Sequence, residues 1–177
     1  MNICVFCGSS MGNDEQYINA ARELGCELAS SGHRLVYGGG NVGLMGVLAD
    51  AVLENEGEVI GVIPDFLVRR EVAHHGVTSL EVVDSMHLRK ERMASLAEAF
   101  IALPGGWGTL DELAEILTWR QLGLIDQPVG ILNTNAFFSP LLSQMRLMVQ
   151  EGFLAEHHLK GLVINDSVKG LLSAIDA

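Results

Sequence analysis

Short apolar runs alternate along this chain with longer segments in which apolar residues recur at helical spacing. Runs such as "LVYGGG" and "AFIALPGG" are apolar at consecutive positions, which is typical of strands buried on both faces of a parallel sheet. The runs predict about seven strands: Ile3–Cys7, Arg34–Tyr37, Glu58–Ile63, Ser79–Val82, Ala99–Leu103, Val129–Leu132 and Leu162–Ile164. The helical periods predict six helices: Asp14–Ser31, Val42–Asn55, Met86–Ala97, Thr109–Gly123, Phe137–Glu151 and Val168–Ile175.

The order of these elements predicts an α/β fold in a single domain over residues 1–177. Strands that alternate with helices through short glycine-containing turns are typical of a doubly wound, Rossmann-like architecture. We therefore expect a mainly parallel sheet of about seven strands flanked by helices. The segment Pro64–Thr78 is the longest irregular stretch, and long loops in such folds often cover a binding site.

The composition narrows the choice of partners. The chain of 177 residues carries a net charge of -11. A nucleic-acid surface needs a basic stripe, and anionic membranes repel an acidic surface, so we expect neither as a partner. A small phosphorylated ligand remains compatible, because a local pocket can be positive within an acidic protein. We see neither a membrane-length apolar run nor a signal-peptide pattern, and we expect a cytoplasmic protein.

The cysteines and histidines do not form a pattern for metal or redox chemistry. Cys4 and Cys7 make a CxxC pair, but both fall in the first predicted strand, where residues three apart lie on opposite faces. No second pair completes a zinc site, and the odd count of three cysteines argues against a disulfide framework. The histidines, including His74 and His75 in the long loop, lack the spacing of metal ligands. We therefore expect no metal ion and no cofactor.

Three loops rich in small residues follow strand ends: "CGSS", "YGGGNVGLMG" and "LPGGWGT". In open parallel sheets ligands bind outside those ends, so the loops predict one crevice. In the second loop Gly39, Gly40 and Gly43 either bring backbone N–H groups to a phosphate or sugar, or allow a tight turn and close helix packing. The loop is not a clean dinucleotide fingerprint, because it follows the second strand, and the P-loop pattern GxxxxGK[ST] is absent.

The third loop opens a helix, and its sequence suits an anion. Gly105, Gly106 and Gly108 free the backbone, and Thr109 stands where the predicted helix begins. The N–H groups and the dipole of a first helical turn attract phosphate. In the alternative interpretation Thr109 only caps the helix, and Asp111 is an ordinary first-turn acid.

Glu112 lies on the same helix, although an acid there cannot bind phosphate. A helical wheel places Leu110, Leu113, Ala114 and Leu117 on one face, which we expect to be the core face. Glu112 points away from that face and can overhang the crevice from the first turn. It can then serve a different part of the same ligand, one turn away from the phosphate.

The segment "DSMHLRKERMASLAEAF" supplies cations. Arg89 shares an inward face with Met86 and Met93, and Lys90 lies at the margin of that face. A guanidinium on an inward face is costly unless a partner meets it. In one interpretation Arg89 extends its charged end to solvent or forms a structural ion pair. In the other, Arg89 and Lys90 reach the crevice and supply the positive charge that the overall composition lacks.

The segments "PGGWGTLDE", "MHLRK" and "YGGGNVGLMG" together resemble the Lonely Guy (LOG) family, whose motifs are PGGxGTxxE, MHxRK and YGGGxxGLMG. The resemblance covers nearly the whole chain, including "EILTWRQLGL" and "PVGILN". It implies a cytokinin riboside 5'-monophosphate phosphoribohydrolase, which cleaves the N-glycosidic bond of a nucleoside monophosphate and releases the base and ribose 5-phosphate. Such proteins were often mislabelled lysine decarboxylases, and this sequence offers no pyridoxal-phosphate site in support of that label.

The resemblance also implies roles for individual residues. Arg89 and Glu112 match the catalytic pair. The expected substrate-binding residues, including glycines and a methionine of the neighbouring motifs, are Glu71, Lys90, Gly105, Gly106, Trp107, Gly108, Thr109, Leu110, Asp111, Thr118, Gly39, Gly40, Gly43 and Met86. The family is typically homodimeric, with sites near the subunit interface.

The identity of the base stays open. The segment "PDFLVRREVAHHG" is more similar to the bacterial branch of the family than to the plant branch, so AMP or a related nucleotide is an alternative to a cytokinin nucleotide. Two other functions also remain: a general purine nucleoside-monophosphate nucleosidase, and a non-catalytic carrier of a nucleotide or of molybdenum cofactor on the same fold.

Overall fold

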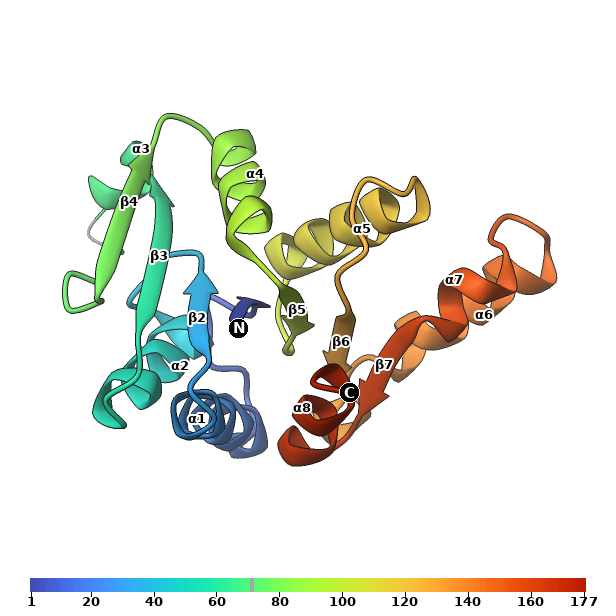
Figure 1. Ribbon diagram of the computed structural model, residues 1–177, viewed down its shortest axis with the longest axis horizontal. Helices are drawn as coiled ribbons and strands as arrows, with labels where there is room; N and C mark the ends of the chain where they lie inside the picture. The colour runs from blue at the N-terminus through green and yellow to red at the C-terminus, as the bar shows by residue number, and fades with distance from the viewer. Residues whose placement is uncertain (71) are drawn as a thin grey trace.

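The computed structural model describes residues 1–70 and 72–177 and contains a seven-stranded sheet (Figure 1). The strand order is β4-β3-β2-β1-β5-β6-β7, and every neighbouring pair runs parallel. The predicted α/β class is confirmed, and the sheet is parallel throughout. The strands are β1 (Asn2–Phe6), β2 (Arg34–Tyr37), β3 (Val59–Pro64), β4 (Ser79–Val83), β5 (Ala99–Ala102), β6 (Val129–Leu132) and β7 (Leu162–Asn165).

Helices cover both faces of this sheet, and Figure 1 shows α1, α2 and α8 on one side with α4 and α5 on the other. Alternate residues of β1 therefore enter two cores, because successive side chains of a strand point to opposite faces. Ile3 and Val5 belong to the core with α1, α2 and α8, and Cys4 and Phe6 to the core with α4, α5 and α6. The helices are α1 (Glu15–Ser30), α2 (Gly43–Glu54), α3 (Asp65–Val68), α4 (Met86–Leu96), α5 (Trp107–Gln121), the 3-10 helix η1 (Thr134–Ala136), α6 (Ser139–Gln150), α7 (Glu156–Lys160) and α8 (Val168–Ile175).

The six predicted helices correspond to α1, α2, α4, α5, α6 and α8, and all their ends agree within two residues. The short helices α3, η1 and α7 were not predicted, because none is long enough to show a helical period. Helix α3 falls within the segment Pro64–Thr78, which we had expected to be irregular. Within the described part of the chain, no helix has the length and hydropathy needed to cross a membrane.

The predicted core face of α5 is wrong in part. Leu113 is buried as expected, but Ala114 is exposed, and Leu110 and Leu117 are only half-buried. These apolar residues face α6 and α7 across an open groove of about 600 Å³, instead of a closed core layer. The fully covered face of α5 carries Leu113 and Ile116 together with Thr109 and Glu112. A hydrophobic pattern could not reveal this face, because two of its members are polar.

The chain order reverses at β1, whose neighbours are β2 and β5, and such a switch point opens a crevice at the strand ends. Backbone hydrogen bonds tie the three glycine loops together there: Gly8 N–H donates to Pro104 O (3.1 Å), and Leu44 N–H donates to Gly8 O (3.0 Å). Gly43 has φ of +60°, and a Cβ at this position would lie 2.2 Å from the carbonyl carbon of Ser9. Gly43 therefore serves the tight turn and the close packing of α2.

Candidate functional site

A cavity of about 550 Å³ lies among the described residues at the carboxyl ends of β1, β2 and β3, where the sequence predicted a crevice. The first turn of α5 closes one side of it. A second cavity of about 210 Å³ adjoins it and shares Ser9 and Gly106 with its wall. Seven of the predicted site residues line the larger cavity: Gly40, Arg89, Gly106, Trp107, Gly108, Thr109 and Glu112.

Within the described part of the chain, no side chain caps the backbone amides of the first turn of α5, which lines this cavity. Helix α5 begins at Trp107, and its N-cap residue is Gly106, which has no side chain to accept from the first amides. The interpretation that Thr109 caps the helix is therefore wrong, because Thr109 lies inside the first turn and is buried. A Cβ at Gly105 would lie 2.0 Å from the Thr109 hydroxyl, so only glycine fits against this turn. Unsatisfied amides and the helix dipole together favour a bound anion.

Glu112 is a buried carboxyl in the cavity wall. It is 9% exposed, and within the described chain no hydrogen bond reaches its carboxyl oxygens. Burial raises the pKa of Glu112 to about 7, because a carboxylate loses hydration there, while the positive charge of Arg89 opposes the rise. The wheel placed Glu112 opposite the core face. The structure places it on the covered face, and it still lines the cavity.

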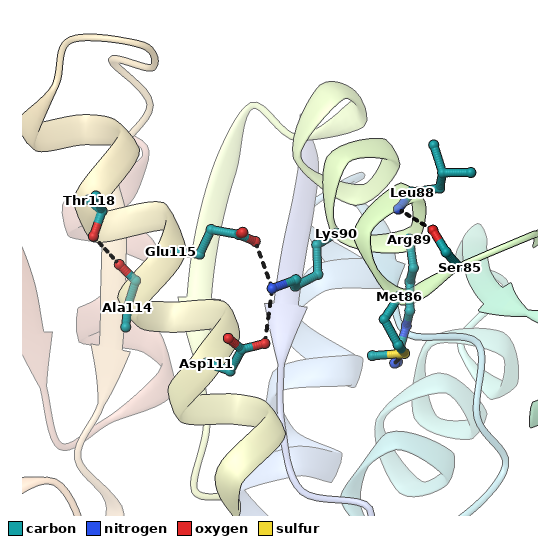
Figure 2. Close-up of polar contacts among 9 residues, drawn as sticks. All are labelled: Ser85, Met86, Leu88, Arg89, Lys90, Asp111, Ala114, Glu115 and Thr118. Carbon is teal, nitrogen blue, oxygen red and sulfur yellow. Dashed lines mark hydrogen bonds and ion pairs between the residues drawn. The ribbon is translucent and has the colours of Figure 1, made fainter.

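Arg89 is buried, and its guanidinium is held by backbone carbonyl groups. Ser85 caps α4 by accepting from Leu88 N–H (3.2 Å), and Arg89 follows one turn later, as Figure 2 shows. Arg89 Nε donates to Val62 O (3.2 Å), and Nη2 donates to Gly38 O (3.0 Å). Among the described residues it forms no direct ion pair, and it lines the cavity. Its charge acts on Glu112 through space.

Lys90 turns from the cavity toward α5. Its Nζ lies 3.0 Å from Asp111 Oδ2 and 3.2 Å from Glu115 Oε2, as Figure 2 shows. Burial lowers the pKa of Lys90, but the hydrogen bonds that its ammonium group donates to Asp111 and Glu115 outweigh this effect and hold the pKa above its ordinary value. These contacts tie α4 to α5, and neither Lys90 nor Asp111 lines the 550 Å³ cavity.

The other predicted residues lie around the cavity or in the apolar groove. Leu110 and Thr118 line the groove between α5, α6 and α7, where the Thr118 hydroxyl donates to Ala114 O (2.8 Å; Figure 2). Met86 Sδ contacts Arg89 Nη1 at 3.8 Å. Gly39 has φ of +72° and lies within the turn after β2. Glu71 lies outside the described residues.

A further part of the cavity wall comes from helix α3 and the loop before β4, where the sequence predicted a cover and one binding residue, Glu71. Leu67, Arg70 and Val72 line the cavity. The loop is docked on the glycine turn: Asn41 N–H donates to Val72 O (2.7 Å), and His74 N–H donates to Gly39 O (2.9 Å). The sequence did contain a signal for Arg70, because it is a positively charged residue in the segment that was expected to cover the site.

The fold is that of an α/β protein of the doubly wound, Rossmann-like class, and the cavity lies near the switch point of the sheet, where ligands bind in such folds. Solved structures of the same architecture agree. The molybdenum cofactor binding protein from Rippkaea orientalis aligns with a TM-score of 0.75 at 24% identity, over 99% of this chain and 94% of that chain. The Moco carrier protein from Chlamydomonas reinhardtii aligns with a TM-score of 0.73 at 22% identity, over 99% and 94%. At these identities the likeness concerns the fold alone.

Sequence comparison identifies the family. A family model described as "Possible lysine decarboxylase" matches residues 45–175. The cytokinin riboside 5'-monophosphate phosphoribohydrolase LOG1 of Arabidopsis thaliana is 48% identical over 174 residues, which is 98% of this chain and 82% of the relative. The cytokinin riboside 5'-monophosphate phosphoribohydrolase of Rhodococcoides fascians is 46% identical over 175 residues, 98% and 88% respectively. The chain belongs to this family, which includes the Lonely Guy (LOG) proteins, and the resemblance of its motifs is confirmed.

The buried carboxyl predicts a pH-dependent stability difference between the wild-type protein and Glu112→Gln. The pKa of Glu112 is raised from its ordinary 4.5 to about 7, so ionising it destabilises the folded protein as pH rises from 4.5 to 7. Glutamine does not ionise. Glu112→Gln should therefore gain stability over wild type across that window, by up to about 3 kcal/mol above pH 7.

Urea denaturation of both proteins at pH 4.5, 6 and 8 measures the difference. Glu23→Gln, which removes an exposed acid of α1, is the matched control and should show no such trend. A constant difference between Glu112→Gln and wild type across these pH values would contradict a raised pKa.

Proposed function

We propose that this protein hydrolyses the N-glycosidic bond of a cytokinin riboside 5'-monophosphate or of AMP, and releases the free base and ribose 5-phosphate. The observation that carries the proposal is Glu112, a buried carboxyl without a hydrogen-bond partner among the described residues, in the wall of a cavity that also meets the start of α5. The names of the curated relatives support the same activity.

The phosphate is anchored at the first turn of α5 in this proposal. The amides of Gly106–Thr109 and the helix dipole can bind the phosphate without a positively charged side chain. Binding energy from this remote, non-reacting group can then hold C1' of the ribose at the reacting position. Arg70, which lines the cavity and has no acid partner among the described residues, supplies further positive charge.

Glu112 acts at the sugar carbon. Departure of the base builds positive charge on the ribose ring, and a carboxylate close to C1' stabilises that charge. It can then attack C1' itself or activate a water molecule. In either sequence water supplies the hydroxyl group that ends on C1' and the proton that ends on the base. Arg89 is assigned the second catalytic role, because its charge favours the ionised form of Glu112 in a buried place.

The other residues that match substrate-binding positions of the family are proposed to contact the substrate or to hold the walls of its site in place. Trp107 is 89% exposed at the cavity mouth and offers an aromatic face for a base. Lys90 acts through Asp111 by fixing α4 against α5. The other residues in this group are Glu71, Gly39, Gly40, Gly43, Met86, Gly105, Leu110 and Thr118.

The names of the relatives favour a cytokinin nucleotide, whereas the loop "PDFLVRREVAHHG" leaves AMP and other purine nucleotides as alternatives. A non-catalytic carrier shares the fold, but binding alone does not require a buried acid without a hydrogen-bond partner among the described residues of the cavity. A cytoplasmic location is part of the proposal, because the described Cys4, Cys7 and Cys26 are all free thiols, as suits a reducing compartment.

The central assay incubates the protein with AMP and with isopentenyladenosine monophosphate, followed by chromatography of the released bases. Free base should appear from at least one nucleotide. Glu112→Gln should lower kcat by about 100-fold or more, which is the usual loss when one group that stabilises the transition state is removed. Glu23→Gln should retain wild-type kcat. Release of neither base, or unchanged release by Glu112→Gln, would overturn the proposal.

We also propose a homodimer formed through the groove of α5, α6 and α7. The groove is lined mainly by apolar side chains, and exposed Leu122, Leu124 and Phe153 lie on the segments that flank it. A monomer would leave this large apolar surface in water. Thr118, a predicted substrate-binding residue, lies in the same groove, which suits a site near the subunit interface.

Light scattering at micromolar concentration should give twice the mass of one chain. Met148→Glu places a charge in the groove and should yield monomers. Val82→Glu, at an exposed apolar position on the edge strand β4, is the control and should remain dimeric. A monomeric wild-type protein would refute the dimer without affecting the chemistry proposed for Glu112.

A further inference from the structure

Gly38, the first residue after β2, lies directly under the guanidinium of Arg89. Its carbonyl oxygen accepts from Arg89 Nη2 at 3.0 Å. A Cβ built on Gly38 would lie 1.7 Å from that same Nη2 and 2.8 Å from Arg89 Cζ. These distances are far inside van der Waals contact, so any side chain at position 38 must displace the guanidinium.

The glycine at this position is explained by space and not by backbone conformation. Its neighbour Gly39 has φ of +72°, and Gly43 has φ of +60°, so both need glycine for their backbone geometry. Gly38 is not among the residues with positive φ. What its missing side chain provides is the room that Arg89 occupies.

The guanidinium is fixed at two strand ends at once. Nε donates to Val62 O of β3, and Nη2 donates to Gly38 O beyond β2. With the weaker contact from Nη1 to Met86 Sδ, three of the five N–H groups have partners among the described residues, and two have none there and can serve the cavity that Arg89 lines. A displaced Arg89 would lose the carbonyl contacts of a buried cation, which are costly to leave unmade.

We propose that Gly38 is a positioning residue for the reaction. It leaves space for the Arg89 guanidinium on the end of β2, from where that charge acts on the carboxyl of Glu112. The kinetic test of this inference rests on the proposed function, whereas its stability test depends only on the packing of Gly38 against Arg89.

The electrostatic consequence concerns Glu112. Among the described residues, the charged and titratable groups that act on it or share its cavity are Arg89 and Lys90 of α4, Asp111 and Glu115 of α5, Arg70, and the thiols of Cys4 and Cys7. Arg89 is the largest influence that lowers the pKa of Glu112, against the rise caused by burial. Moving the guanidinium away therefore raises that pKa further and reduces the carboxylate present near pH 7.

The test compares four proteins: wild type, Gly38→Ala, Arg89→Ala and the double variant. With the nucleotide that wild type hydrolyses, Gly38→Ala should lower kcat/KM by about tenfold or more, and should move the acid limb of its pH profile to higher pH. In the Arg89→Ala background the same alanine has no guanidinium to displace. It should then change kcat/KM less than about twofold, which is strong non-additivity.

Thermal unfolding of the same four proteins gives a readout that is independent of activity. Gly38→Ala should lower Tm in the wild-type background and leave it nearly unchanged in the Arg89→Ala background. A Gly38→Ala protein that fails to fold while the double variant folds supports the inference equally. Equal losses in both backgrounds, or wild-type kcat/KM and Tm for Gly38→Ala, would overturn it. Absence of hydrolysis by wild type would refute only the proposed function, because the Tm comparison still decides the role of Gly38.

Discussion

The guanidinium of Arg89 rests on the carbonyl oxygens of Gly38 and Val62 and not on the carboxylate of Glu112. A buried catalytic acid must be able to ionise near neutral pH, and its carboxylate oxygens must stay accessible; this arrangement allows both. Without a nearby positive charge, burial would keep Glu112 protonated near neutral pH. In a direct ion pair, the carboxylate oxygens would be occupied by the guanidinium. Holding the cation on backbone carbonyls gives Glu112 electrostatic support and leaves its oxygens open to the cavity.

Helix α5 combines two features with opposite electrostatic preferences. Its first turn has uncapped amides and a positive dipole end, which suit a phosphate. Glu112, still close to that turn, suits the sugar carbon that becomes positive when a glycosidic bond breaks. Lys90 holds α5 against α4 through Asp111 and Glu115, so the acid and Arg89 keep their separation. The same helix exposes Leu110, Ala114 and Leu117 to the groove proposed to hold the second subunit.

Much of the fold could be predicted from the sequence, because buried parallel strands are uniformly apolar and each predicted strand and helix exists. For the candidate site, the sequence predicted the glycine loops at the strand ends and two of the charged residues that line the cavity. The covered face of α5 was not, since Thr109 and Glu112 interrupt its hydrophobic pattern. The docking of the loop with Arg70 and Val72 depends on backbone hydrogen bonds to the glycine turn, for which side-chain patterns carry no signal. Gly38 was one glycine among several, and its special role appears only in three dimensions.

The pH dependence of kcat/KM for nucleotide hydrolysis tests the central claim most directly, because it reports the ionisation of groups in the free protein and free substrate. The pKa of Glu112 is raised to about 7, and the carboxylate is the active form, so kcat/KM should fall as pH drops through 7. The substrate phosphate titrates near pH 6 and is identified by titrating the nucleotide alone. An acid limb with an apparent pKa near 7 is the predicted result. A kcat/KM that stays constant from pH 8 down to pH 5 would contradict a buried Glu112 carboxylate as the group that acts on the sugar.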